Sequence, residues 1–450
     1  MAGEVQTAPP PSEPRRSLAV GAALLTLLRI SALGSNAVVS VIVARLLGPS
    51  GSGRFAIAAG VLAFLSVLSG LGLENGATWM VSGRRWSARS AFATTQVAAL
   101  ALGCAGGLVG LGIYEAAADS LFGGLGLGLA VLVAIGVPGA LGMVYASQVA
   151  LALERYEPAV LIPAALAGGY IAGVAALAAV WGLPGAVGGL LAGQAAGWAA
   201  GLWWGVRGGL VGGAVDRERL RAALRFGFTV YLANLLAVLM LRFDLFVLNA
   251  STSAKVVGYY AVAIAVTNPL WLVPAALGSA LFPRSASFAA PEAEDREHVE
   301  TKALRHAVLL LAAGAVVLAI VLLVLLEPIY GARFHRALEP ALLLLPGGVA
   351  TGLATIFTAS LMGRGRPAYV LGGALASTAI AIGLYLAFVP IYKANGAAVA
   401  STVSYLVNAL VLGALLQRLS GRPTLPRLVP GRAELRDYRS LAARVRARWP

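Results

Sequence analysis

Four charged side chains fall inside stretches that are otherwise apolar. Arg29 lies in the run 18–47, Glu74 in 55–82, and both Arg242 and Asp244 in 227–249. A charge inside a membrane-crossing helix costs about 3 kcal/mol or more, so it faces protein or water rather than lipid. The planar guanidinium of arginine suits phosphate and carboxylate groups, whereas a carboxylate can hold a proton or a cation. These residues predict a polar cavity that handles a charged group.

Other polar residues share helical faces with the two arginines. On a helix, Asn36 falls on the face of Arg29, and Asn234 falls on the face of Arg242. Such stripes can also hold helices together through polar contacts alone, but the arginine in each favours the wall of a cavity. The predicted substrate-binding residues are Arg29, Asn36, Tyr231, Asn234, Arg242, Asn249 and Gln194.

The two acidic residues allow more than one interpretation. Glu74 lies in the inner half of its run, where it either binds a proton or cation or pairs with a neighbouring arginine. Asp244 is two residues from Arg242, roughly 200° around a helix, so the two side chains cannot point at one spot. Asp244 is therefore either an ion-coupling residue or a structural partner for a neighbouring helix. Coupling to a proton or sodium gradient is the expectation that depends on these acids.

Nothing in the sequence indicates catalysis or a bound metal. Cys104 is the only cysteine, and the three histidines lack the spacing of metal ligands. The phosphate-binding pattern of P-loop nucleotide hydrolases does not occur. We therefore expect no catalytic residue, no metal and no cofactor.

Composition places the chain in the membrane. The mean hydropathy is +0.83, and 59% of residues are hydrophobic while 12% are charged. A soluble protein of this length carries far more charge, so we predict an all-α polytopic membrane protein. The apolar runs predict twelve transmembrane helices, roughly 18–47, 55–82, 90–113, 125–153, 159–181, 184–206, 227–249, 256–283, 307–327, 341–362, 368–389 and 394–417.

The basic charge follows the predicted topology. Most of the 34 Lys and Arg residues fall in the terminal segments and in the loops after even-numbered runs. The positive-inside rule then places both termini in the cytoplasm of a cell that carries the protein in its cytoplasmic membrane. The net charge of +15 is thus a topology signal, and nucleic acid is not an expected partner.

Two similar halves are expected. The passage 44–58 resembles 249–263, and both place a polar turn between two apolar runs. We predict two pseudo-symmetric six-helix lobes around a central cavity. The predicted divisions are a disordered cytoplasmic arm 1–17, an N-terminal lobe 18–206, a cytoplasmic amphipathic linker 207–226, a C-terminal lobe 227–418 and a basic amphipathic tail 419–450.

Two further segments carry local predictions. A glycine recurs at every fourth position from 185 to 205, which predicts a seam where another helix packs closely. The mixed-charge segment 291–302 before the ninth run is expected to be a solvated loop.

Several short motifs resemble those of oligosaccharide flippases of the multidrug/oligosaccharidyl-lipid/polysaccharide (MOP) superfamily. They are 44–49 followed by 51–55, then 242–244, 257–260 and 282–283, and the likeness extends over 18–418. The resemblance implies a V-shaped pair of six-helix lobes that moves a polyprenyl-pyrophosphate-linked glycan by alternating access. It also implies that the cavity arginines meet the pyrophosphate or acidic sugars.

The expected partners are a lipid-linked oligosaccharide, membrane lipids, and glycan polymerase and export proteins. Three alternatives remain: a multidrug antiporter of the same superfamily, which would favour acidic cavity residues, a membrane-embedded glycan-transfer enzyme, and a twelve-span transporter of another fold. The short predicted outer loops, with no catalytic carboxylates, argue against the enzyme.

Overall fold

The computed structural model describes residues 18–121, 125–272, 274–275, 277–278, 281 and 293–421. Within these residues the chain is helical and forms no strand. The predicted arm 1–17 and nearly all of the predicted tail 419–450 lie outside the described residues. The elements are α1 (Leu18–Gly70), α2 (Leu73–Ser82), α3 (Ala88–Leu121), α4 (Leu127–Ala152), α5 (Tyr156–Arg207), α6 (Arg217–Ser251), α7 (Ala254–Thr267), η1 (Asn268–Trp271), α9 (Ala293–Tyr330), η3 (Ala332–Ala337), α10 (Leu338–Gly363) and α11 (Pro367–Ser420).

The outer surface of this helical structure is apolar. Leu108, Val180 and Leu323 are each more than 60% exposed. Side chains of this kind face lipid in a membrane protein. Among the described residues, seven helical stretches are long and apolar enough to cross a membrane: Gly34–Gly70, Ala88–Ala116, Leu127–Ala152, Tyr156–Arg207, His298–Tyr330, Ala332–Gly363 and Ala368–Ser420. The prediction of an all-α polytopic membrane protein is confirmed.

Helices α5 and α11 each fold back on themselves as a hairpin. Gly182 in α5 has φ 61° and ψ −130°, and Lys393 in α11 has φ 53° and ψ −126°, so one residue reverses the chain in each. The predicted glycine seam forms the inner edge of the second arm of α5. A Cβ on Gly189 would lie 2.3 Å from the backbone nitrogen of Val174, in the first arm. The packing role predicted for these glycines is confirmed.

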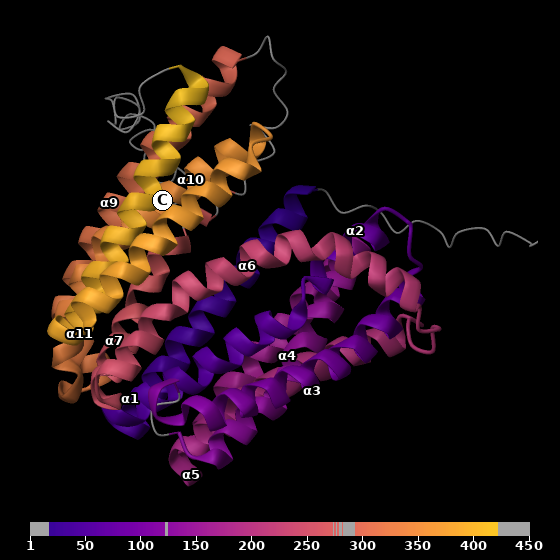
Figure 1. The fold of residues 1–450 in the computed structure, drawn as a ribbon, viewed down its shortest axis with the longest axis horizontal. Coiled ribbons are helices and arrows are strands. Elements are labelled where there is room, and N and C mark those ends of the chain that lie inside the picture. Colours follow the sequence, from indigo (N-terminus) through magenta and orange to yellow (C-terminus); the bar gives the residue numbers. More distant parts are fainter. Residues whose placement is uncertain are drawn as a thin grey trace, which may run out of the picture.

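The helices form two groups that meet at one end and diverge toward the other (Figure 1). Helices α1 to α5 make one group, and α7 to α11 make the second. The largest buried apolar cluster joins both groups, since it contains Val43 of α1, Tyr260 of α7 and Phe334 of η3. We call the region where the groups meet the closed end; it comprises residues 45–53, 254–260 and 328–337.

Helix α6 connects the two groups. It starts beside α2, crosses the space between the groups, and ends beside α7 and α11 (Figure 1). Near its start, Gly227 lies against Gly72, where a Cβ on Gly227 would be 2.1 Å from the Gly72 oxygen. The segment 217–226, which the sequence assigns to a linker, forms the first turns of this continuous helix, held by an N-cap bond from the Arg219 N–H to Asp216.

Three local features differ from the sequence-based expectation or refine it. The second predicted run is interrupted at Leu71 and Gly72, which both have positive φ. Segment 293–302 is helical rather than a loop, and its Glu300 is fully buried and paired with Arg364 at 2.6 Å. This prediction was wrong because a charged residue with a buried partner is indistinguishable from a solvated one in sequence. The eighth run is interrupted by the 3₁₀ turn η1, with Pro269 near its start.

Candidate functional site

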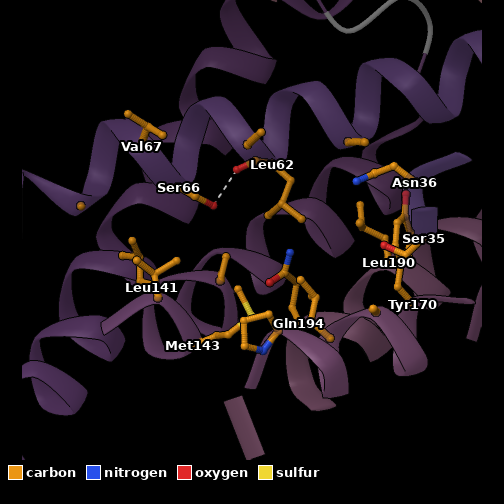
Figure 2. A pocket seen from close by; sticks show the side chains of 18 of the residues that line it. Ser35, Asn36, Leu62, Ser66, Val67, Leu141, Met143, Tyr170, Leu190 and Gln194 are labelled. Atoms are coloured by element: carbon orange, nitrogen blue, oxygen red, sulfur yellow. Dashed lines mark hydrogen bonds between the residues drawn. The ribbon is translucent and has the colours of Figure 1, made fainter. Parts of the chain in front are cut away.

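A cavity of about 360 Å³ lies among α1, α2, α4, α5 and α6 (Figure 2). Four residues predicted from the sequence line it: Asn36, Glu74, Gln194 and Arg242. They come from four different helices and are up to about 200 positions apart in the chain. The fold therefore gathers both a guanidinium and a carboxylate into one cavity.

Arg242 is the single residue of α6 among those that line the cavity. The other lining residues all belong to the N-terminal group. Arg242 is also close enough to interact electrostatically with Tyr170 of α5 and Tyr405 of α11. Its positive charge thus stands between the two groups of helices.

Glu74 reaches the cavity because the helix that carries it is broken. It lies in the first turn of α2, where the positive end of the helix dipole stabilises a carboxylate. The carbonyl oxygens that the break leaves at the end of α1 accept hydrogen bonds from tyrosines. Tyr145 donates to Gly70 at 3.0 Å, and Tyr231 donates to Leu68 at 3.1 Å.

Uncharged polar groups and apolar walls complete the cavity. Asn36 and Ser35 lie near Tyr170, while Gln194 projects between Tyr170 and Met143 (Figure 2). The Gln194 Oε1 atom is buried and has no hydrogen-bond partner among the described residues. Most of the remaining lining residues are apolar. The cavity can therefore hold an anionic group at Arg242 with polar groups beside it.

The structure separates the other predicted substrate-binding residues from this cavity. Tyr231 is buried against α1, and Asn234 is exposed. Asn249 is buried near the C-terminal end of α6. Although these residues share a helical face with Arg242, α6 is long enough for that face to meet different neighbours along its length. Arg29 lies in α1, and its side chain lies outside the described part of the structure.

Asp244 is directed into the C-terminal group. Its Oδ2 accepts a hydrogen bond from Tyr260 at 2.7 Å, and the Tyr260 hydroxyl also contacts Ser401 at 3.0 Å. Tyr385 reaches the same Ser401 hydroxyl at 2.9 Å. In the described part of the chain Asp244 makes no direct salt bridge, although Arg242 is near enough to act on its carboxylate electrostatically. It is a buried, hydrogen-bonded carboxylate that joins α6, α7 and α11.

Sequence reasoning missed several groups that build the site. Tyr170 and Ser66 line the cavity, and Tyr145 supports the helix break. Uncharged polar residues in apolar runs are common, so no local sequence pattern singled these residues out. No group of three or more His, Cys, Asp or Glu residues in the described structure could hold a metal ion.

Solved transporter structures share this fold. A structure of the lipid II flippase MurJ in an inward closed conformation matches with a TM-score of 0.71 and 14% identity, covering 91% of this chain and 90% of that one. An inward-facing multidrug resistance MATE family transporter of the MOP superfamily matches with a TM-score of 0.61 and 18% identity, covering 90% of this chain and 94% of that one. A third match is a MOP superfamily transporter from Pyrococcus furiosus, which is described as having a binding pocket of reverse polarity. Its TM-score is 0.55 and its identity 16%, and the match covers 90% of this chain and 97% of that one.

The sequence itself has one informative relationship. No individually curated protein matches it. The family described as polysaccharide biosynthesis protein matches residues 18–289, which is more than half of the chain. Its relatives in fold are membrane transporters and flippases rather than enzymes. The chain therefore belongs to the polysaccharide biosynthesis protein family and has the fold of MOP superfamily transporters.

Proposed function

We propose that the protein is a flippase for a polyprenyl-pyrophosphate-linked oligosaccharide used to build cell-surface polysaccharide. The observation that carries this proposal is Arg242, which lines the cavity from the connecting helix α6. A pyrophosphate accepts bidentate hydrogen bonds from a guanidinium, and sugar hydroxyls pair with groups such as Asn36 and Gln194. Membership of the polysaccharide biosynthesis family supports the substrate class.

The transport cycle that we propose is alternating access between two six-helix lobes in the cytoplasmic membrane. Twelve crossings follow if α5 and α11, as hairpins, each cross twice and the kink at Gly48 separates two crossings in α1. The MurJ and MATE relatives, whose matched structures include inward- and outward-facing conformations, support movement of this kind. Both termini would then be cytoplasmic.

Replacing Arg242 tests the proposal. We expect Arg242→Ala to abolish glycan export in cells that lack their own flippase, because the anionic group loses its partner. Arg242→Lys should recover part of the export, since a lysine keeps the charge but not the planar fork of donors. Export would be followed by surface glycan staining, with membrane insertion checked by the amount of full-length protein.

A double variant separates substrate binding from internal charge balance. If Arg242 serves only to neutralise Asp244, then Arg242→Leu combined with Asp244→Leu removes both charges and restores export. If Arg242 binds the substrate, the double variant stays inactive. Restored export would contradict the proposed role of Arg242.

A multidrug antiporter is the second candidate, and Glu74 in the cavity is the observation that favours it, because a carboxylate attracts cationic drugs. Drug-resistance assays distinguish the two functions. An antiporter would protect sensitive cells from cationic dyes, and that protection would be lost in Glu74→Gln.

A further inference from the structure

We infer that the closed end is a gate, formed by a glycine crossing between α1 and α7 and latched by Arg45 on the end of α9. Its place in a transport cycle rests on the proposed function, because a cavity that alternates between two sides must open here in one half of the cycle. The latch itself is defined by contacts that do not involve substrate.

The glycine crossing brings two main chains into direct contact. A Cβ on Gly53 would lie 1.9 Å from the oxygen of Ala254, and a Cβ on Gly258 would lie 1.8 Å from the oxygen of Pro49. Real Cβ atoms do not approach backbone oxygens so closely, so α1 and α7 can meet here only because both residues are glycine. The contact is reciprocal, because each glycine lies directly against the main chain of the other helix.

Arg45 ties the same region to the C-terminal group. Its Nε donates to the Ile329 oxygen at 2.8 Å, and its Nη2 donates to the Pro328 oxygen. These carbonyls lie in the last turn of α9, where a helix leaves oxygens without internal partners and carries the negative end of its dipole. A guanidinium at this position stabilises the helix end and also joins the two groups.

Both the Arg45 hydrogen bonds and the glycine crossing can separate at little cost. Arg45 is exposed, so water can replace the Pro328 and Ile329 oxygens when the groups part. The glycine crossing contributes no interlocking side chains, so its two backbones can separate without repacking. Behind it, Tyr259 packs edge-on against Phe334 with ring centroids 6.2 Å apart. A close backbone contact without interlocking side chains, held by the hydrogen bonds of one arginine, is suited to repeated opening.

A buried reporter residue can detect opening. Ser52 is 5% exposed and lies beside Gly53 on the face of α1 that carries Pro49. We would introduce Ser52→Cys into full-length protein whose own cysteine is removed by Cys104→Ala, purify it in lipid nanodiscs, and measure the rate of labelling by a soluble maleimide. Nanodiscs expose both sides of the protein, so the result does not depend on membrane orientation.

Removal of the latch should expose the reporter. We expect Arg45→Ala to raise the labelling rate about tenfold, the change that about 1.4 kcal/mol produces, while Arg54→Ala, an exposed arginine on the same helix, leaves it unchanged. Gly53→Ala should raise the rate as well, because its methyl group prevents the crossing. Gly60→Ala is its control, since a Cβ on Gly60 meets nothing within 4 Å.

The inference is decided by comparing Arg45→Ala and Gly53→Ala with their controls, Arg54→Ala and Gly60→Ala. Arg45→Ala changes an exposed side chain and should keep the fold, so it decides the outcome even if Gly53→Ala aggregates. Unchanged labelling in Arg45→Ala, or equal increases in Arg45→Ala and Arg54→Ala, would overturn the latch. A protein with a normal latch but no glycan export would contradict the proposed function instead.

Discussion

Arg242 and Asp244 are separated by one residue and serve different sides of α6. Arg242 lines the cavity of the N-terminal group, while Asp244 is bonded to Tyr260 in the C-terminal group. The angular separation of the two side chains follows from helical periodicity and was predictable from the sequence. Which neighbour each side chain meets depends on the packing of helices that are distant in the chain, and that was not predictable.

If transport is coupled to an ion gradient, we propose that Glu74, the carboxylate that lines the cavity, is the coupling residue. We expect Glu74→Gln to remove the dependence of transport on a proton or sodium gradient, because the amide keeps the shape of the side chain but cannot bind a proton or carry a charge. Substrate binding should remain measurable, since Arg242 is unchanged. Transport into inverted vesicles with and without an imposed gradient would measure this.

A matched control is available in the same group of helices. Glu115 of α3 is exposed and does not line the cavity, so Glu115→Gln should transport normally. Full gradient-driven transport by Glu74→Gln would assign Glu74 a structural role at the start of α2.

At the scale of single elements, the glycines of α5 make a specific stability prediction. Gly189→Ala should destabilise the protein by about 1–3 kcal/mol, because its methyl group overlaps the backbone at Val174. Gly168→Ala, in the first arm of the same hairpin, meets nothing within 4 Å and should not destabilise it. Thermal unfolding in detergent would compare the two. Equal melting temperatures would show that the seam tolerates side chains.

Apolar runs predicted where the helices lie better than where they begin, join or break. The reversal at Gly182 was placed correctly between two runs, yet a glycine next to apolar residues looks the same in a continuous helix. The break at Leu71 and Gly72 was missed, because its carbonyl oxygens are satisfied by Tyr145 and Tyr231 from other helices. Partners supplied over such sequence distances leave no local pattern.

At the scale of the whole molecule, the distribution of basic residues predicts the orientation. Ser50 lies at the closed end, and Ser87 lies in the basic loop between α2 and α3; both are exposed. In a Cys104→Ala background on intact cells, an impermeant thiol reagent should label Ser50→Cys but reach Ser87→Cys only after the membrane is permeabilised. Labelling of both on intact cells would overturn this topology.

The single-residue reversals in α5 and α11 have a consequence for biosynthesis. A polar loop that must be carried across the hydrocarbon core slows the insertion of a membrane segment, since each unpaired backbone group costs several kcal/mol in lipid. If the two hairpins each cross the membrane twice, as proposed, the chain turns at Gly182 in α5 with hardly any polar chain to carry across, while the turn of α11 carries only the short polar segment around Lys393. On this proposal each hairpin would enter the bilayer as one unit rather than as two separate segments. Turns of this length would also expose little to a protease or an antibody on the side of the membrane that they face.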